Sequence, residues 1–120
     1  MDTNDVTAEI IGSAFIVSNV LGSGYLEKVY ENALAVELRK RGLRVAQQAM
    51  IPVFYDGVAV GRYAADLMVE ARVLVELKAA RAIDEIHQAQ LLNYLKATGL
   101  KVGLLLNFGT PRLGIRRMML

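Results

Sequence analysis

The pattern of apolar and polar positions divides the 120-residue chain into helical and extended segments. Apolar residues at helical spacing predict a first helix that is capped by Asp5 or Thr7 and runs to about Val20. A second helix is predicted from about Leu26 to Arg41, with Gly42 as its left-handed stop. The positions expected to face inward are Ile10, Ile11, Ala14, Phe15 and Val17 in the first helix and Val29, Ala33, Val36 and Leu38 in the second.

The middle of the chain changes to an extended pattern. Residues 45–55 (VAQQAMIPVFY) and 58–69 (VAVGRYAADLMV) are predicted strands, and the Asp56-Gly57 dipeptide between them is a strong hairpin signal. Residues 72–79 (RVLVELKA) are a third strand, which follows a turn near Glu70-Ala71. Three consecutive antiparallel strands are therefore expected.

The last third alternates again between helix and strand. A third helix is predicted from Asp84 to Gly99, and the apolar run 100–108 (LKVGLLLNF) is typical of a strand buried on both faces. Such a strand-helix-strand unit normally forms a right-handed parallel crossover. The tail after Pro111 is a candidate edge strand. The expected fold is α/β, a small mixed β-sheet flanked by helices in the order α-α-β-β-β-α-β, in one domain that spans residues 1–120.

Composition narrows the class of protein. Apolar residues make up 54% of the chain, enough for a real core, and there is no Cys for a disulfide framework or a thiolate metal site. The N-terminal MDTND is acidic where a secretory signal is basic, and no apolar stretch reaches the ~20 residues needed to cross a bilayer. We therefore expect a cytoplasmic protein without a membrane segment.

Positive charge is concentrated in two clusters although the net charge is only +2. These are RKRGLR at residues 39–44 and RLGIRR at residues 112–117. Basic clusters suit a polyanion partner, although a solvated basic face is the common alternative. The candidate nucleic-acid contacts are Arg39, Arg41, Arg116 and Arg117.

The segment DLMVEARVLVELK, residues 66–78, carries the candidate chemistry. Side chains two apart on a strand share a face, so Glu76 and Lys78 point the same way. If the hairpin turns near residues 70 and 71, Asp66 lies opposite Val75 or Glu76, with Cβ atoms roughly 5 Å apart. Two carboxylates at this short separation repel each other, which favours a divalent cation between them. The hard cation Mg²⁺ fits a chain whose possible metal ligands include one His and no Cys. The alternative is a solvated Glu-Lys ion pair on a strand.

Helical residues add further candidates. Gln90 and Tyr94 are four apart and share a face of the third helix, with His87 one turn earlier. Glu27 and Tyr30 share a face at the start of the second helix. The structural alternatives are a core aromatic for Tyr94, a surface amide for Gln90, a packing or capping residue for His87 and a dipole-complementing acid for Glu27.

Together these residues resemble a known family. Asp66, then Glu76-Leu77-Lys78, then Gln90-x-x-x-Tyr94 are similar to the PD-(D/E)XK nuclease superfamily in its RecB-like branch. More closely, GYLEKVY (residues 24–30) resembles the signature of the GxxExxY protein family, a group of small bacterial proteins within that superfamily. The resemblance covers nearly the whole chain, through LGSGYLEKVYENAL, ELRKRGL, YAADLMVE, VELKA, QLLNYLKATG, GLLLNFG and GIRR.

The resemblance implies a restriction-endonuclease-like core and a role for each matching residue. Asp66 and Glu76 would bind the divalent metal, with the Leu77 carbonyl as a further ligand and Glu27 completing the site. Lys78 would position the attacking water and stabilise the phosphorus centre. The implied role of the helical pair, Gln90 and Tyr94, is to orient the lysine or the phosphate.

Two positions depart from the family pattern. The family usually has a His on the first helix where this chain has Ser18, and Gly-Pro-Gly where this chain has GSG at residues 22–24.

The predicted function is a nuclease that uses Mg²⁺, or Mn²⁺, to hydrolyse phosphodiester bonds of nucleic acid, DNA more than RNA, by attack of an activated water. The alternative is a non-catalytic nucleic-acid-binding or interaction module on the nuclease fold. A third possibility is a self-associating structural unit, because so apolar a small chain could expose an oligomerisation face. A homodimer is a separate expectation for the nuclease, because many small nucleases dimerise to reach two strands.

Overall fold

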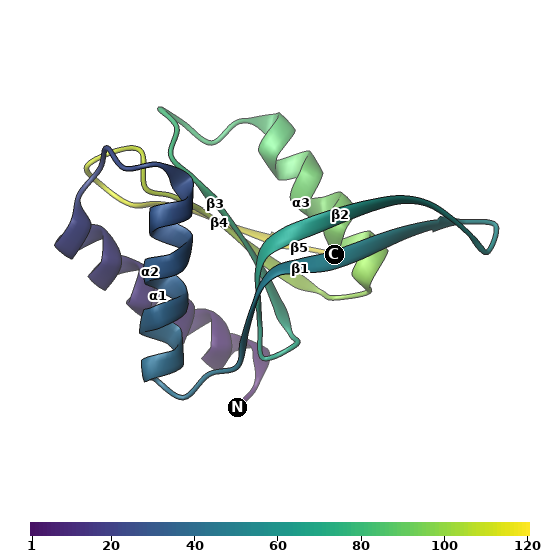
Figure 1. Cartoon of the computed structure of the whole chain (residues 1–120), viewed down its shortest axis with the longest axis horizontal. Helices are drawn as coiled ribbons and strands as arrows, with labels where there is room; N and C mark the ends of the chain where they lie inside the picture. Colours follow the sequence, from purple (N-terminus) through teal and green to yellow (C-terminus); the bar gives the residue numbers. More distant parts are fainter.

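The computed structural model describes all 120 residues as three helices and one five-stranded sheet whose strands follow chain order, β1-β2-β3-β4-β5 (Figure 1). The elements are α1 (Thr3–Leu21), α2 (Glu27–Lys40), β1 (Val45–Tyr55), β2 (Val58–Val69), β3 (Val73–Lys78), α3 (Glu85–Thr98), β4 (Val102–Asn107) and β5 (Gly114–Met119). Only β3 and β4 are parallel, joined through α3, and the other neighbours are antiparallel. The predicted α/β order is confirmed, and the tail forms edge strand β5.

Turns and caps define most of the boundaries. Asp56-Gly57 turns the first hairpin, and Glu70 and Ala71 turn the second with φ of 55° and 52°, a left-handed pair typical of tight hairpins. The predicted cap of α1 is wrong, because the cap is Asp2. The Asp2 side chain accepts a hydrogen bond from the Asp5 amide at 2.8 Å, and the Asp5 side chain accepts one from the Asp2 amide. Because of this reciprocal capping box, the helix begins earlier in the chain than the apolar pattern predicts.

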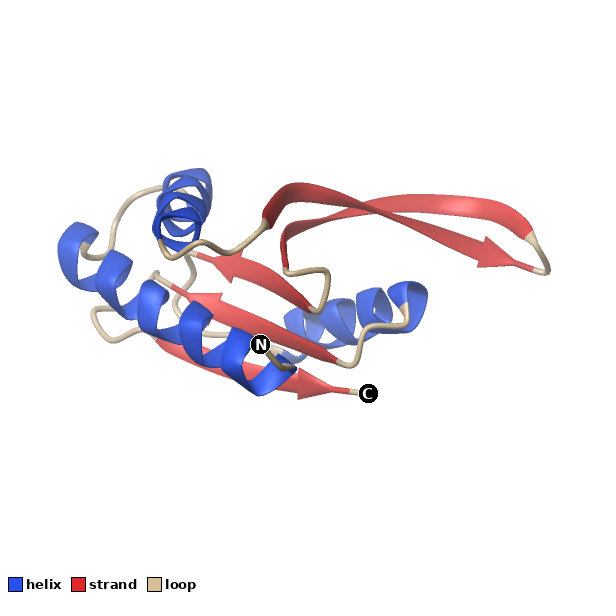
Figure 2. Cartoon of the chain, turned by 90° about the horizontal axis from the view of Figure 1, so that it is seen from below, coloured by secondary structure: helices blue, strands red, loops and turns tan.

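The helices cover the two faces of the sheet, as the turned view in Figure 2 shows. The larger core lies between α1, α2 and one face, and a smaller core lies between α3 and the other face. The side chains of β3 divide accordingly: Val73, Val75 and Leu77 belong to the larger core, whereas Leu74 belongs to the smaller one.

Three predicted inward positions are wrong, because Phe15, Val29 and Val36 are exposed. On α2 the buried face is instead centred on Tyr30. Its ring stacks on Phe108 at 4.7 Å, and its hydroxyl donates to the backbone carbonyl at position 22 at 2.6 Å. This contact orients α2.

The β1–β2 hairpin extends beyond the body of the molecule (Figure 1). The two strands pair along their whole length, but β2 pairs with β3 only over residues 67–69. We call the projecting part, residues 50–64, the arm. Its charged residues are Asp56 and Arg62. The large apolar side chains that it exposes are Met50, Phe54, Tyr55, Val58, Val60 and Tyr63.

None of the three helices combines the length and hydrophobicity that crossing a membrane requires.

Candidate active site

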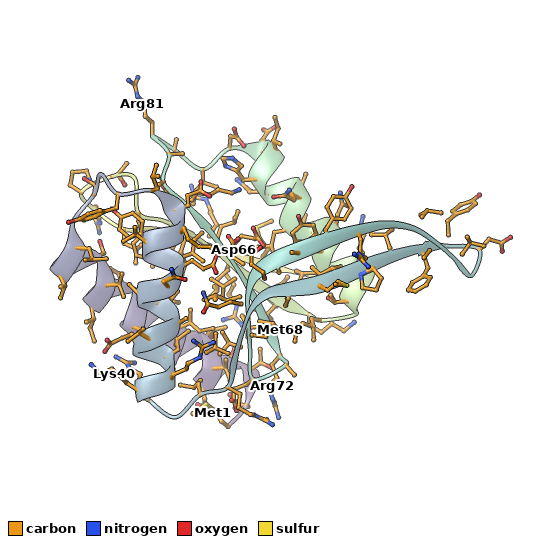
Figure 3. The ribbon with its side chains drawn as sticks, viewed as in Figure 1. Met1, Lys40, Asp66, Met68, Arg72 and Arg81 are labelled. Carbon is orange, nitrogen blue, oxygen red and sulfur yellow. The ribbon has the colours of Figure 1, made fainter.

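The two acids of the opening segment meet where β2 separates from β3. The ladder between these strands ends at the pair Leu67–Val75, which leaves the next backbone amides without carbonyl partners. The Asp66 amide donates to Glu76 Oε1 at 3.0 Å, and the Leu77 amide donates to Asp66 Oδ2 at 2.9 Å. Each carboxylate thus replaces a ladder bond, and the pair is held face to face. Figure 3 shows Asp66 near the middle of the molecule, where the arm joins the body.

Burial makes Glu76 hard to ionise. Its side chain is only 5% exposed, and burial, followed by the nearby Asp66 carboxylate, raises the pKa of Glu76 from 4.5 to about 8. Lys78 opposes this rise in the pKa. The proton and a divalent cation are alternative ways to relieve the repulsion between the two acids. This donor set of carboxylate oxygens fits a hard cation such as Mg²⁺ or Mn²⁺.

Leu77 and Lys78 complete the strand side of the site. In a strand, the N–H and C=O of one residue point to the same side, so the Leu77 carbonyl faces the same open edge as its amide. Lys78 is the last residue of β3, on the same face as Glu76, and it takes part in none of the ion pairs of the fold. The residue is half-buried, and its ammonium group has no carboxylate partner.

The chain that follows Lys78 is fixed by Asn107, a buried residue opposite it on β4. The Asn107 side chain accepts from the amides of Ala80 and Gly109, both at 3.0 Å, and donates to the Ala80 carbonyl at 2.9 Å. A Cβ on Gly109 would lie 2.3 Å from the Ala80 backbone, so this contact demands glycine. The loop after β3 is therefore clamped to β4.

The sequence did not reveal the link between Asp66 and α2. Glu31, only 4% exposed, accepts from the Gln48 side chain at 2.7 Å and from the Gln47 side chain at 2.8 Å. The Gln48 amide also donates to Asp66 Oδ1 at 3.2 Å. Gln48 lies within β1 at φ 51°, a left-handed backbone that non-glycine residues rarely adopt and that is found at functional sites. The only signals for this link are the QQ pair within a strand and the spacing of Glu31, one turn after Glu27.

Glu27 occupies a different place from the acid pair. It is exposed in the first turn of α2 and lines a hollow of about 590 Å³ with Ala79, the residue after Lys78. No group of three or more acid or His side chains in the structure is arranged to hold a metal ion. The structure therefore brings Asp66 and Glu76 together but does not add Glu27 to them.

Gln90 and Tyr94 lie on the side of α3 that faces the arm. Both line a groove of about 810 Å³ between α3 and the arm, and the Tyr94 ring lies 5.6 Å from that of Tyr63 on the arm. Burial, then the charge of Glu76, raises the pKa of Tyr94, so its hydroxyl stays protonated as a donor. Both members of the predicted pair thus line the groove.

His87 takes the capping role. Its amide donates to the Asp84 carboxylate at 3.0 Å, and its ring accepts from the Asp84 amide at 3.4 Å. Ser18, at the position where the resemblance leads us to expect His, lies among the buried residues of α1.

The four candidate arginines do not form one patch. Arg41 pairs with Glu9 at 2.8 Å, and Arg39 donates to the backbone of β1. Arg116 and Arg117 are neighbours on β5 and so point to opposite faces of the sheet, with Arg117 bonded to side chains of α1. Arg116 is exposed, and its hydrogen bond is to the carbonyl of its own neighbour.

Comparison with known proteins agrees with this fold. The fold is similar to the crystal structure of SSO0001, with a TM-score of 0.57 and 16% identity over 78% of this chain, although the chain spans only 50% of that structure. It is also similar to an alkaline exonuclease from Laribacter hongkongensis, with a TM-score of 0.54 and 13% identity, covering 95% of this chain and 80% of the exonuclease. The curated proteins give no match. Residues 4–118 match the PD-(D/E)XK nuclease superfamily, and the chain belongs to that superfamily.

Proposed function

We propose that the chain is a metal-dependent nuclease that hydrolyses phosphodiester bonds of nucleic acid, with DNA as the favoured substrate. The observation that carries the proposal is the reciprocal bonding of Asp66 and Glu76 at the end of the β2–β3 ladder, with the unpaired Lys78 on the same face. Within the superfamily, Gly24, Glu27 and Tyr30 support placement in the GxxExxY group of the RecB-like branch.

In this proposal the residues of the site have separate tasks. Asp66, Glu76 and the Leu77 carbonyl hold the cation, and Glu27 is a further ligand only if α2 brings it closer to them. When bound, the cation supplies the Lewis-acid chemistry that makes water nucleophilic at neutral pH. Lys78 donates to the attacking water or to a phosphate oxygen and stabilises the negative charge that develops there. Gln90 and the protonated Tyr94 orient the lysine or the phosphate.

The test is a cleavage assay on single-stranded DNA, duplex DNA and RNA in Mg²⁺ or Mn²⁺, with EDTA as the metal-free arm. Lys78→Ala should lower the cleavage rate by about 100-fold or more, the cost of removing one preorganised donor. Lys101→Ala, at the opposite end of the parallel β3–β4 pair, is the matched control and should cleave like the wild type. Equal cutting by both variants would show that Lys78 takes no part in the cleavage and would contradict the proposed site.

A non-catalytic binding module is the second candidate, favoured by the absence of a preassembled group of three metal-ligating side chains. It predicts nucleic-acid binding that is unchanged by EDTA and no cleavage with any of the three substrates. Binding should then weaken steeply with salt, because phosphate contacts release counterions. Substitution of Arg39, Arg41 or Arg116 should weaken that binding.

A further inference from the structure

A groove with a mostly apolar lining lies between α3 and the arm. Figures 1 and 2 both show the arm extending over α3. The groove has a volume of about 810 Å³, within the range of small-molecule sites. The arm contributes Val53, Phe54 and Tyr63, and α3 contributes two amide side chains, Gln90 and Asn93, with one lysine, Lys96.

The groove lies beside the candidate active site. Tyr94 lines it and packs in the same core cluster as Ala65, the residue before Asp66, and Leu105, the β4 partner of Glu76. Its ring also lies 5.6 Å from that of Tyr63, in a tilted arrangement, so an aromatic surface runs from Tyr94 out along the arm. A polymer held at the acids would therefore have its next residues over this surface.

The lining has the chemistry of a nucleobase site. A base offers two flat apolar faces, which stack on aromatic side chains, and a polar edge, which bonds to amide groups. Phe54 and Tyr63 provide the faces, Gln90 and Asn93 provide the amides, and Lys96 can meet a phosphate. A duplex presents its phosphates instead and calls for dense positive charge, whereas the arm carries only Arg62 as a cation.

We propose that this groove binds the unpaired nucleotides of a single strand next to the phosphodiester held at Asp66 and Glu76. The inference rests on the proposed nuclease function and specifies its substrate as single-stranded or frayed nucleic acid. Because stacking does not depend on base identity, the groove accepts any sequence. Phe54, Tyr63 and Asn93 bind the bases and take no part in the reaction.

The experiment measures binding in EDTA, so that no strand is cut, by fluorescence anisotropy of a labelled single-stranded oligodeoxynucleotide. The comparison ligands are the same strand with abasic sites and the corresponding duplex. Tyr63→Ala should weaken binding of the intact strand by about tenfold, because stacking on an aromatic is worth that much per base. Tyr55→Ala is the matched control, because Tyr55 is an exposed tyrosine on the same arm that does not line the groove.

The inference is supported if the wild type binds the intact strand at least tenfold more tightly than the abasic strand and only Tyr63→Ala removes the difference. Equal binding of intact and abasic strands, or equal effects of both variants, would overturn it. It would also be overturned if sedimentation shows a dimer that Tyr63→Ala dissociates, because the groove would then hold a second copy of the chain. Base-dependent binding without cleavage in the presence of metal would support the single-strand site and refute the nuclease activity. Cleavage without base-dependent binding would support the nuclease activity and refute the single-strand site.

Discussion

Replacing Glu76 with Gln should change how the stability of the metal-free protein depends on pH. Glutamine has the shape of the protonated acid and can still accept the bond from the Asp66 amide. Burial raises the pKa of Glu76 in the folded chain to about 8 from the 4.5 expected when the chain is unfolded. Each pKa unit of difference corresponds to about 1.4 kcal/mol of free energy of unfolding.

The sign follows from the direction of this rise. Below pH 4.5 the acid is protonated in both states of the wild type, so Glu76→Gln and the wild type should differ little. Between pH 4.5 and about 8 only the unfolded wild type ionises, so the wild type loses stability relative to the variant as pH rises. The variant should be the more stable protein at pH 9, by up to about 5 kcal/mol.

The assay is urea unfolding followed by circular dichroism, in EDTA, from pH 4 to pH 9. Glu70→Gln is the control with the opposite sign, because the bond from the Arg44 amide lowers the pKa of Glu70. That variant should lose stability relative to the wild type as the pH rises toward 4.5, and the difference should stay constant above that pH. If the difference between Glu76→Gln and the wild type is the same at every pH, burial does not raise the pKa of Glu76.

Three further substitutions test the supports of the site. Gln48→Gly should relieve the backbone strain at φ 51° but remove the hydrogen bond to the Asp66 carboxylate, so cleavage activity should fall while thermal stability does not. A loss of both activity and stability would contradict this expectation. Asn107→Ala should lower the free energy of unfolding by about 2–3 kcal/mol, because it leaves the amide and carbonyl of Ala80 without their partner. A loss under about 0.5 kcal/mol in chemical unfolding would show that Asn107 does not hold the loop. Ser13→Ala should raise the melting temperature slightly, since its buried hydroxyl has no partner, and a lower melting temperature would mean that the hydroxyl is satisfied.

Strong local signals made most of the fold predictable. Both hairpin turns, the left-handed stop at Gly42 and the buried strand β4 were all predicted from a few neighbouring residues. The inward face of α2 was not predictable from the sequence, because Tyr30 and Val29 are both apolar. Only the stacking of Tyr30 on Phe108 determines which of the two faces the core. The projection of the arm was also not predictable, since its apolar residues look the same in sequence whether or not a third strand pairs with them.

The candidate site was predictable only in part, for a similar reason. Asp66, Glu76 and Lys78 were found from strand alternation across one hairpin, which is short-range geometry. Glu31 and Gln48 were missed because their contact joins α2 to β1, and it depends on an unusual backbone angle at Gln48 that no sequence pattern encodes.

The position of the acids follows from the way the arm leaves the sheet. Leu67 packs in the core under α1 and α2, but Ala65, two residues earlier, packs under α3, so β2 changes faces at Asp66. There it can no longer pair with β3, and the amides of residues 66 and 77 need acceptors that only side chains can supply. The two carboxylates are thus part of the backbone bonding of the fold as well as of the proposed chemistry. Alanine at Asp66 or Glu76 would leave an amide unpaired at a cost of about 1–3 kcal/mol, whereas Asn or Gln keeps an acceptor oxygen and removes only the charge. Amide variants are therefore the ones that separate loss of catalysis from loss of structure.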